Sequence, residues 1–285
     1  IGPLGSADST APVLMLPGNI VASAVGPSGV AVTYVVSAHD DQDPNPSVTC
    51  APASGTVFAL GVTIVTCSAT DASRNISSAD FTVTVRDTTA PAFGSLPAPI
   101  AYATSTSGVA VSYTNPPASD AVDGARPVSC SPASGSTFAP GSTTVFCTAR
   151  DLQGNGATAS FVVKVTYQAP LNGAFFLQPI NADGSSVFKF GSTVPVKFAL
   201  TGASSAITNL LAKTYVAKSS ETVTGTFIEA TSTSNADSGN VFRYDQSGRQ
   251  YIFNLATKAL SSGTFAIKAD LGDGVIHVVN ISLKP

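Results

Sequence analysis

The sequence predicts an all-β protein of three tandem β-sandwiches, and three observations indicate this fold class. Apolar residues alternate with polar ones at a period of two, and no stretch of residues 7–167 shows helical spacing over two turns. Val and Thr, whose branched side chains favour pleated strands, dominate the alternating segments. The chain also repeats itself with a period of about 80 residues, which is the size of a small sandwich.

The repeat consists of several motifs in one order. "DSTAPV" at Asp8 recurs as "DTTAPA" at Asp87. "VTCAPASGTVFALGVTIVTCSATDASRN" (48–75) recurs as "VSCSPASGSTFAPGSTTVFCTARDLQGN" (128–155). Gly, Pro, Asn and Ser clusters separate the alternating segments at short intervals, as turns between strands do. We therefore expect two sandwiches of about seven short strands each.

Alternation also predicts which side chains of these strands share a face. In "DFTVTVRD", Phe81, Val83 and Val85 point to the same side of a strand. Domain boundaries follow from the repeat, with one sandwich over residues 7–87 and the next over 88–167. The opening "IGPLGS" resembles the remnant of an engineered protease site, so residues 1–6 are left out of fold reasoning.

The repeated motifs resemble a known family. A "D-x-T-x-P" start, "V-x-C-x-P-x-S-G-x-x-F-x-x-G", "T-x-V-x-C-x-A-x-D" and a closing "F-x-V-x-V" are similar to the hyalin repeat (HYR) module, twice over residues 8–167. The resemblance implies an extracellular, immunoglobulin-like module linked to adhesion. The β-sandwich prediction stands without it.

The third segment, residues 168–285, has no cysteine and none of these landmarks. "GSTVPVKFALTG" (191–202) and the closing stretch from "YIFNLATKAL" resemble the bacterial PxKF domain. In the first of these, Val194, Val196 and Phe198 alternate on one face. We expect a third, divergent β-sandwich with a short helix around Leu255–Leu260.

The four cysteines favour disulfides over a metal site. Cys50 and Cys67 lie in the first repeat, and Cys130 and Cys147 occupy the matching positions in the second, with the same separation. We therefore predict one bond within each repeat, which would stabilise a thin core by about 3 kcal/mol. A four-cysteine metal site would need cysteines from separate repeats to converge. Disulfides in both repeats predict an extracellular, secreted or cell-surface location.

Composition excludes several function classes. Charged residues make up 11% of the chain, and no Lys or Arg run offers a surface for nucleic acid. The sequence contains no run of about 18 uninterrupted apolar residues, which a membrane-spanning helix would need. The chain has two histidines and no "GxSxG", "HExxH" or phosphate-binding loop. Of the histidines, His277 alternates with valines as a strand residue and His39 has no counterpart in the second repeat. We therefore expect no catalysis by this chain and no required cofactor.

Acidic side chains recur at corresponding loop positions of both repeats. Loops that follow different strands of such a sandwich meet at one end, and Ca²⁺ binds six to eight oxygens from such loops. A bound ion would stiffen the joint between the repeats. The alternative is that these Asp residues cap turns through their side chains. The candidate ligands are Asp40, Asp43 and Asp71, with Asp8 and Asp41 beside them, in the first repeat, and Asp87, Asp120, Asp123 and Asp151 in the second.

The sequence thus predicts a structural or adhesive stalk or spacer of a secreted or cell-surface bacterial protein. Its partner would be another surface protein or a glycan, and the isolated chain would be monomeric. The alternative is a carbohydrate-directed accessory region of a secreted hydrolase. For that role Tyr244 and Tyr251, on a predicted hairpin in the third segment, are the candidate ligand-binding residues, although exposed aromatics of sugar sites are often Trp and the chain has none.

Overall fold

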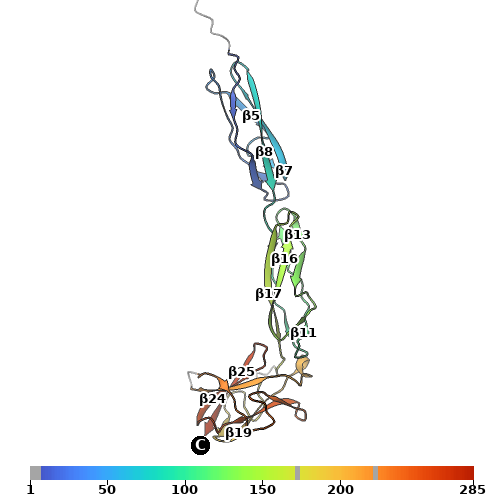
Figure 1. The fold of residues 1–285 in the computed structure, drawn as a ribbon, viewed down its shortest axis with the longest axis vertical. Coiled ribbons are helices and arrows are strands. Elements are labelled where there is room, and N and C mark those ends of the chain that lie inside the picture. Colours follow the sequence, from blue (N-terminus) through green and yellow to red (C-terminus); the bar gives the residue numbers. More distant parts are fainter. Residues whose placement is uncertain (1–7, 171–173, 221–223) are drawn as a thin grey trace, which may run out of the picture. The chain divides into compact units, whose positions relative to one another are not determined.

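A computed structural model describes residues 8–170, 174–220 and 224–285. The predicted tag remnant, residues 1–6, lies outside these residues. Within the described chain every regular element except one short 3₁₀ turn is a strand, so the all-β prediction is confirmed (Figure 1). Contacts group the described residues into two compact units, 8–95 with 116–129 and 147–159, and the remainder. The boundaries expected at residues 87 and 167 stay predictions.

Eight strands form the first repeat, drawn in blue to teal in Figure 1. They are β1 (Val13–Met15), β2 (Ile20–Ser23), β3 (Val30–Ala31), β4 (Ser37–His39), β5 (Ser47–Ala51), β6 (Val57–Phe58), β7 (Gly61–Thr70) and β8 (Ile76–Arg86). The main sheet has the order β2-β8-β7-β5, and the pairs β1-β4 and β3-β6 form two smaller sheets. Strand β2 runs parallel to β8, and the other pairs are antiparallel.

The second repeat has the same order of pairing. Its strands are β9 (Ala92–Phe93), β10 (Ile100–Tyr102), β11 (Val109–Ala110), β12 (Ala118–Asp120), β13 (Gly124–Arg126), β14 (Val128–Ser131), β15 (Thr137–Phe138), β16 (Gly141–Arg150) and β17 (Gly156–Thr166). The main sheet is β10-β17-β16-β14, with β11-β15 and β13-β12-β9 beside it. Strand β13 is an addition, because the loop after Asp120 folds back on β12 as a hairpin.

Each repeat buries the face that alternation predicted. Phe81, Val83 and Val85 of β8 are buried together with Val65 of β7 in the core of the first repeat. A tyrosine closes this core at its edge: the Tyr34 ring meets Phe81 edge-on at 5.0 Å, and its hydroxyl donates to the carbonyl of Pro52. Tyr113 makes the same two kinds of contact in the second repeat, to Phe161 and to the carbonyl of Pro132.

The third segment folds into two sheets of its own. The larger has the order β18-β25-β24-β20-β21 and the smaller β19-β23-β22. The bounds are β18 (Val187–Lys189), β19 (Thr193–Phe198), β20 (Lys213–Ser219), β21 (Ile228–Glu229), β22 (Arg243–Asp245), β23 (Gln250–Ala256), β24 (Gly263–Asp270) and β25 (Ile276–Lys284). Val194, Val196 and Phe198 are buried, as alternation predicted.

The helix expected around Leu255–Leu260 is wrong. Leu255 and Ala256 end strand β23, which pairs with β19, and a turn follows in which the Leu260 N–H donates to the Thr257 carbonyl at 3.0 Å. Cross-strand pairing therefore overrides the local helical preference of these residues. The 3₁₀ turn of this segment is found instead at Gly202–Ser204.

Candidate functional site

An aspartate after β4 and its counterpart after β12 organise the first acidic loop of each repeat. Oδ1 of Asp40 accepts the N–H groups of Gln42 at 3.1 Å and Asp43 at 2.9 Å. Oδ1 of Asp120 accepts the corresponding N–H groups of Val122 and Asp123 at 2.7 and 3.0 Å. Both carboxylates therefore cap a turn, as the alternative interpretation of these loops predicted.

A second aspartate in the same loop reaches the neighbouring loop. Oδ2 of Asp43 accepts the Ala72 N–H at 2.9 Å. In the second repeat, Oδ2 of Asp123 accepts the Leu152 N–H at 2.7 Å. Each bond spans 29 residues of sequence. It ties the loop after β4, or after β12 in the second repeat, to the loop between the two longest strands of the main sheet, which are β7 and β8 or β16 and β17.

An Asp–Asn pair closes that second loop. Asp71 accepts the backbone N–H of Asn75 through Oδ1 and the side-chain Nδ2 of Asn75 through Oδ2, both at 2.8 Å. The same Nδ2 lies 3.3 Å from the carbonyl oxygen of Asp8, to which it also donates. In the second repeat, Asn155 donates in the same way to Asp151 and to the carbonyl of Asp87. Three separate segments thus meet at one end of each repeat.

These hydrogen bonds keep carboxylates ionised. The N–H groups of Asp123 and Val122 hold the pKa of Asp120 below its usual value. For Asp71, burial raises the pKa, but the bonds from Asn75 and from the N–H groups of Ser73 and Arg74 together outweigh burial and lower it. Negative charge is therefore present in these loops at neutral pH.

The structure brings together some of the predicted cation ligands and not others. In the second repeat, carboxylate oxygens of Asp87, Asp120 and Asp123 lie within 4.8 Å of one another. Asp151 is outside this group, and both of its oxygens accept hydrogen bonds from Asn155. One oxygen each of Asp87 and Asp120 is buried without a hydrogen-bond partner.

The first repeat groups a different set. Oxygens of Asp8, Asp40 and Asp41 lie within 4.8 Å of one another, whereas Asp43 and Asp71 are used in the loop contacts described above. Asp40 is 7% exposed, and its Oδ2 is buried without a partner. Asp41 is exposed and corresponds to Ala121, so this part of the group has no equivalent in the second repeat.

Sequence reasoning missed the two asparagines that orient these loops. Asn75 and Asn155 stand four residues after Asp71 and Asp151, and their recurrence at one position of the repeat was the available signal. A carboxylate can be recognised in a sequence as a possible metal ligand. The role of a side-chain amide that donates to a carboxylate and to a distant carbonyl can be recognised only once the folded segments are known to meet.

The predicted disulfides are present. Cys50 on β5 bonds Cys67 on β7, with 4.1 Å between the Cα atoms, at directly paired positions of the two strands. Cys130 and Cys147 are disulfide-bonded as well, and no described cysteine is free. The bonds stabilise sheets of the repeats and exclude these four residues from a thiolate metal site.

The hairpin tyrosines of the third segment do not form an exposed aromatic surface. Tyr251 is fully buried; its hydroxyl donates to the Ile207 carbonyl at 2.8 Å and accepts the Leu210 N–H at 3.2 Å. Burial raises its pKa to about 12. Tyr244 is half-buried and packs edge-on against Tyr251 with ring centroids 5.0 Å apart. Tyr251 is therefore a core residue, which corrects its prediction as a ligand-binding residue.

The two histidines lie in different surroundings. His39 is exposed at the end of β4. The His277 ring is half-buried on β25 and stacks on Phe175 at 3.6 Å, and burial lowers its pKa. This packing matches the strand role that alternation predicted for it.

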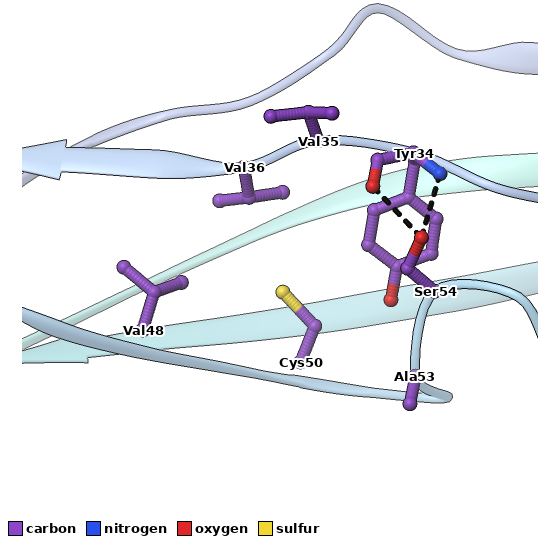
Figure 2. A pocket seen from close by; sticks show the side chains of 7 residues that line it. All are labelled: Tyr34, Val35, Val36, Val48, Cys50, Ala53 and Ser54. Carbon is purple, nitrogen blue, oxygen red and sulfur yellow. Dashed lines mark hydrogen bonds between the residues drawn. The ribbon is translucent and has the colours of Figure 1, made fainter.

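A shallow pocket of about 310 Å³ lies beside Cys50 in the first repeat (Figure 2). Val35, Val36 and Val48 line it with Ala53, and its polar residues are bonded to each other. The Ser54 hydroxyl accepts the Tyr34 N–H and donates to the Tyr34 carbonyl, each at 2.8 Å, as the dashed lines of Figure 2 show. These bonds fix the loop after β5 against the segment between β3 and β4, which carries Tyr34.

The comparisons with known proteins cover the two repeats. The HYR domain family matches residues 7–85 and 86–165, which together make more than half of the chain. Hyalin of Lytechinus variegatus is 35% identical over 167 residues, which are 55% of this chain and 31% of that protein. Hyalin of Strongylocentrotus purpuratus is 34% identical over 165 residues, covering 55% of this chain and 14% of that protein. The chain thus spans under a third of these relatives.

Among solved structures, mouse cadherin-23 EC22-24 aligns with 96% of this chain and 99% of its own, at 12% identity and a TM-score of 0.27. None of the described residues forms a helix long and apolar enough to span a membrane. HYR domains are extracellular, adhesion-type modules, and disulfides in both repeats fit that setting. Because the family model matches more than half of the chain, once in each repeat, the chain belongs to the HYR domain family.

Proposed function

We propose that this chain is a non-catalytic stalk or spacer of a secreted or cell-surface adhesion protein, and that it presents neighbouring parts of that protein to a surface protein partner. One observation supports this most directly: the same loop framework is built twice, from the same residues. In each repeat an Asp–Asn pair uses its side chains to hydrogen-bond backbone groups of that repeat. The pairs are Asp71 with Asn75 and Asp151 with Asn155. Side chains committed in this way stabilise a shape and are not available for substrate.

The proposal is tested by exchanging the chain for a flexible linker. A reporter binding module is displayed on cells above this chain, or above a Gly/Ser linker of equal residue number, which behaves as a random coil. We expect the folded spacer to increase capture of beads whose ligand is shielded by a polymer layer of fixed thickness. Equal capture with both spacers would argue against a stalk. A catalytic activity of the purified chain would overturn the non-catalytic part of the proposal.

A bacterial source and a PxKF identity of the third segment are part of the proposal. They rest on "GSTVPVKFALTG" and the closing stretch, which supply β19 and β23–β25 of this segment. The full-length reading frame tests both: flanking bacterial export or anchoring signals would support them, and an animal gene would overturn them.

The carbohydrate-directed alternative loses its main support with the burial of Tyr251. A glycan array probed with the whole chain tests it, with Tyr244→Ala as the variant that removes the remaining half-buried ring. We expect no bound glycan. Binding that Tyr244→Ala abolishes would favour the accessory role instead. Light scattering of the same sample tests the monomeric state, and a dimer would contradict it.

A further inference from the structure

We propose that the second repeat holds a calcium ion between Asp87, Asp120 and Asp123, and that Asp8, Asp40 and Asp41 form a weaker site of the same kind in the first repeat. The strongest observation is the state of two carboxylate oxygens. Oδ2 of Asp87 and Oδ2 of Asp120 are buried and have no hydrogen-bond partner. A buried carboxylate oxygen without a partner is costly, so such atoms call for a cation or a proton.

The turn contacts do not remove this need. Oδ1 of Asp87 accepts the N–H and the hydroxyl of Thr89, and Oδ1 of Asp120 accepts two N–H groups. Each residue therefore uses Oδ1 to cap its turn and keeps a buried Oδ2 without a partner, and both residues belong to the group formed with Asp123. Turn capping and cation binding use different atoms of the same side chains, so one does not exclude the other.

No side-chain cation neutralises this group among the described residues. The ion pair they contain joins Arg243 to Asp237, in the third segment. In the second repeat, Arg126 and Arg150 direct their guanidinium groups to the carbonyls of Arg150 and Gly154. The three close carboxyl groups thus have no cationic side chain paired with them, and a divalent cation would supply the missing positive charge.

The donor set and its spacing select calcium. All three residues offer hard oxygen ligands and neither nitrogen nor sulfur. Such a donor set does not favour binding of zinc or copper. Two oxygens on opposite sides of a Ca²⁺ ion lie about 4.6–5.2 Å apart, so a group confined within 4.8 Å fits one coordination shell. The irregular loops suit the flexible geometry of Ca²⁺ better than the strict octahedron of Mg²⁺, and water would supply the remaining ligands.

The first repeat provides an internal comparison. There a single buried oxygen, Oδ2 of Asp40, lacks a hydrogen-bond partner. The third member of the group is the exposed Asp41, whereas in the second repeat it is Asp123. The group opens into a pocket of about 360 Å³ that His39 and Thr10 also line. A more exposed, more hydrated group binds an ion less tightly, so affinity should differ between the repeats.

The test is calcium titration of the full chain after chelator treatment, by calorimetry and by thermal unfolding. We expect one ion per chain to bind first, in the range of about 10⁻⁴–10⁻³ M typical of extracellular modules, and a second more weakly. At a calcium concentration 100 times the dissociation constant, the folded-to-unfolded ratio should rise about 100-fold. Magnesium at equal concentration should have a much smaller effect.

The decisive variant is Asp120→Asn. Asn keeps an oxygen for the N–H groups of Val122 and Asp123 and replaces the unpartnered oxygen by an NH₂ group, so the turn persists. In chelator its Tm should equal or exceed that of the unmodified chain, and the first binding event should disappear. Asp80→Asn, which changes an exposed residue of β8, is the matched control and should respond to calcium normally.

Two results would overturn the proposal. The first is an unmodified chain whose heat signal and Tm ignore calcium up to 10 mM, on the order of ten times the largest dissociation constant expected for the first ion. The second is an Asp120→Asn variant that retains the first binding event. Equal responses to magnesium and calcium would overturn the choice of ion.

Discussion

The side-chain nitrogen of Asn155 donates to Oδ2 of Asp151 at 2.5 Å, while the Asn155 backbone N–H donates to Oδ1 of the same carboxylate at 2.7 Å. The same nitrogen also donates to the carbonyl of Asp87, 68 residues earlier. One asparagine thus closes its own loop and attaches it to the segment that opens the repeat.

Asn155→Ala should therefore destabilise the second repeat. The change removes a hydrogen bond to a buried carboxylate and one to a carbonyl, a loss of about 1.5–3 kcal/mol in the free energy of unfolding. Calorimetric unfolding of the whole chain measures it. Gln153→Ala, at an exposed position of the same loop, is the control and should change the free energy by less than about 0.5 kcal/mol. Equal effects of the two changes would contradict the role of Asn155.

Gly29 is required by a close approach of two backbone segments. Its φ is +97°, and a Cβ added there would stand 1.9 Å from the carbonyl oxygen of Phe58. Gly29→Ala must shift that backbone and should cost roughly 2–4 kcal/mol. Gly55→Ala is the matched control, since its φ is +85° but nothing lies within 4 Å, so only the strain of about 1–2 kcal/mol remains. A smaller loss at Gly29 than at Gly55 would refute the steric argument.

The bond between Cys50 and Cys67 should stabilise the first repeat. Replacing both residues by Ala releases a closed loop of 17 residues in the unfolded chain, which is worth about 3 kcal/mol. Chemical denaturation of the double variant checks this. A reducing agent should lower the stability of the unmodified first repeat by a similar amount and leave that of the variant's first repeat unaffected.

Tyr251 should matter for stability through its hydroxyl. Tyr251→Phe leaves the Ile207 carbonyl and the Leu210 N–H without their partner inside the core, at a cost of about 1–3 kcal/mol. The half-buried Tyr244, changed to Phe, should cost less. Differential scanning calorimetry of the two variants decides the order, and the reverse order would contradict a purely structural role for Tyr251.

His277 should make the third segment sensitive to mild acid. Burial lowers its pKa in the folded state below the usual value of 6.5, so the unfolded chain binds the proton more readily. Stability is therefore full above pH 6.5, on the order of the pKa of the unfolded chain, and falls as the pH drops through 6.5 toward the lower pKa of the folded state. Melting curves from pH 7.5 to 5, a range of about 2.5 units around that pKa, should show this decline, and His277→Phe should remove it. A decline of equal size in His277→Phe would assign it to other groups.

Much of the architecture follows from local pattern. Alternation in "DFTVTVRD" placed Phe81, Val83 and Val85 in a core because a strand sends alternate side chains to opposite faces. The recurrence of cysteines at one spacing predicted the disulfides for a similar reason, since equal sequences fold into equal strands. The family resemblance of residues 8–167 rests on the same recurrence, and the HYR match confirms it.

By itself the sequence determined the strands, the repeats, the disulfides and the candidate acidic positions. Only the tertiary structure decided that Leu255 continues a strand, because β19 supplies its partner, and that Tyr251 is buried. It also decided which carboxylates face one another. Asp87 and Asp120 are 33 residues apart in sequence, and whether their free oxygens meet depends on loops held by Asn155 and Asp123. Hydrogen bonds between distant segments set these positions, and alternation within one strand carries no information about them.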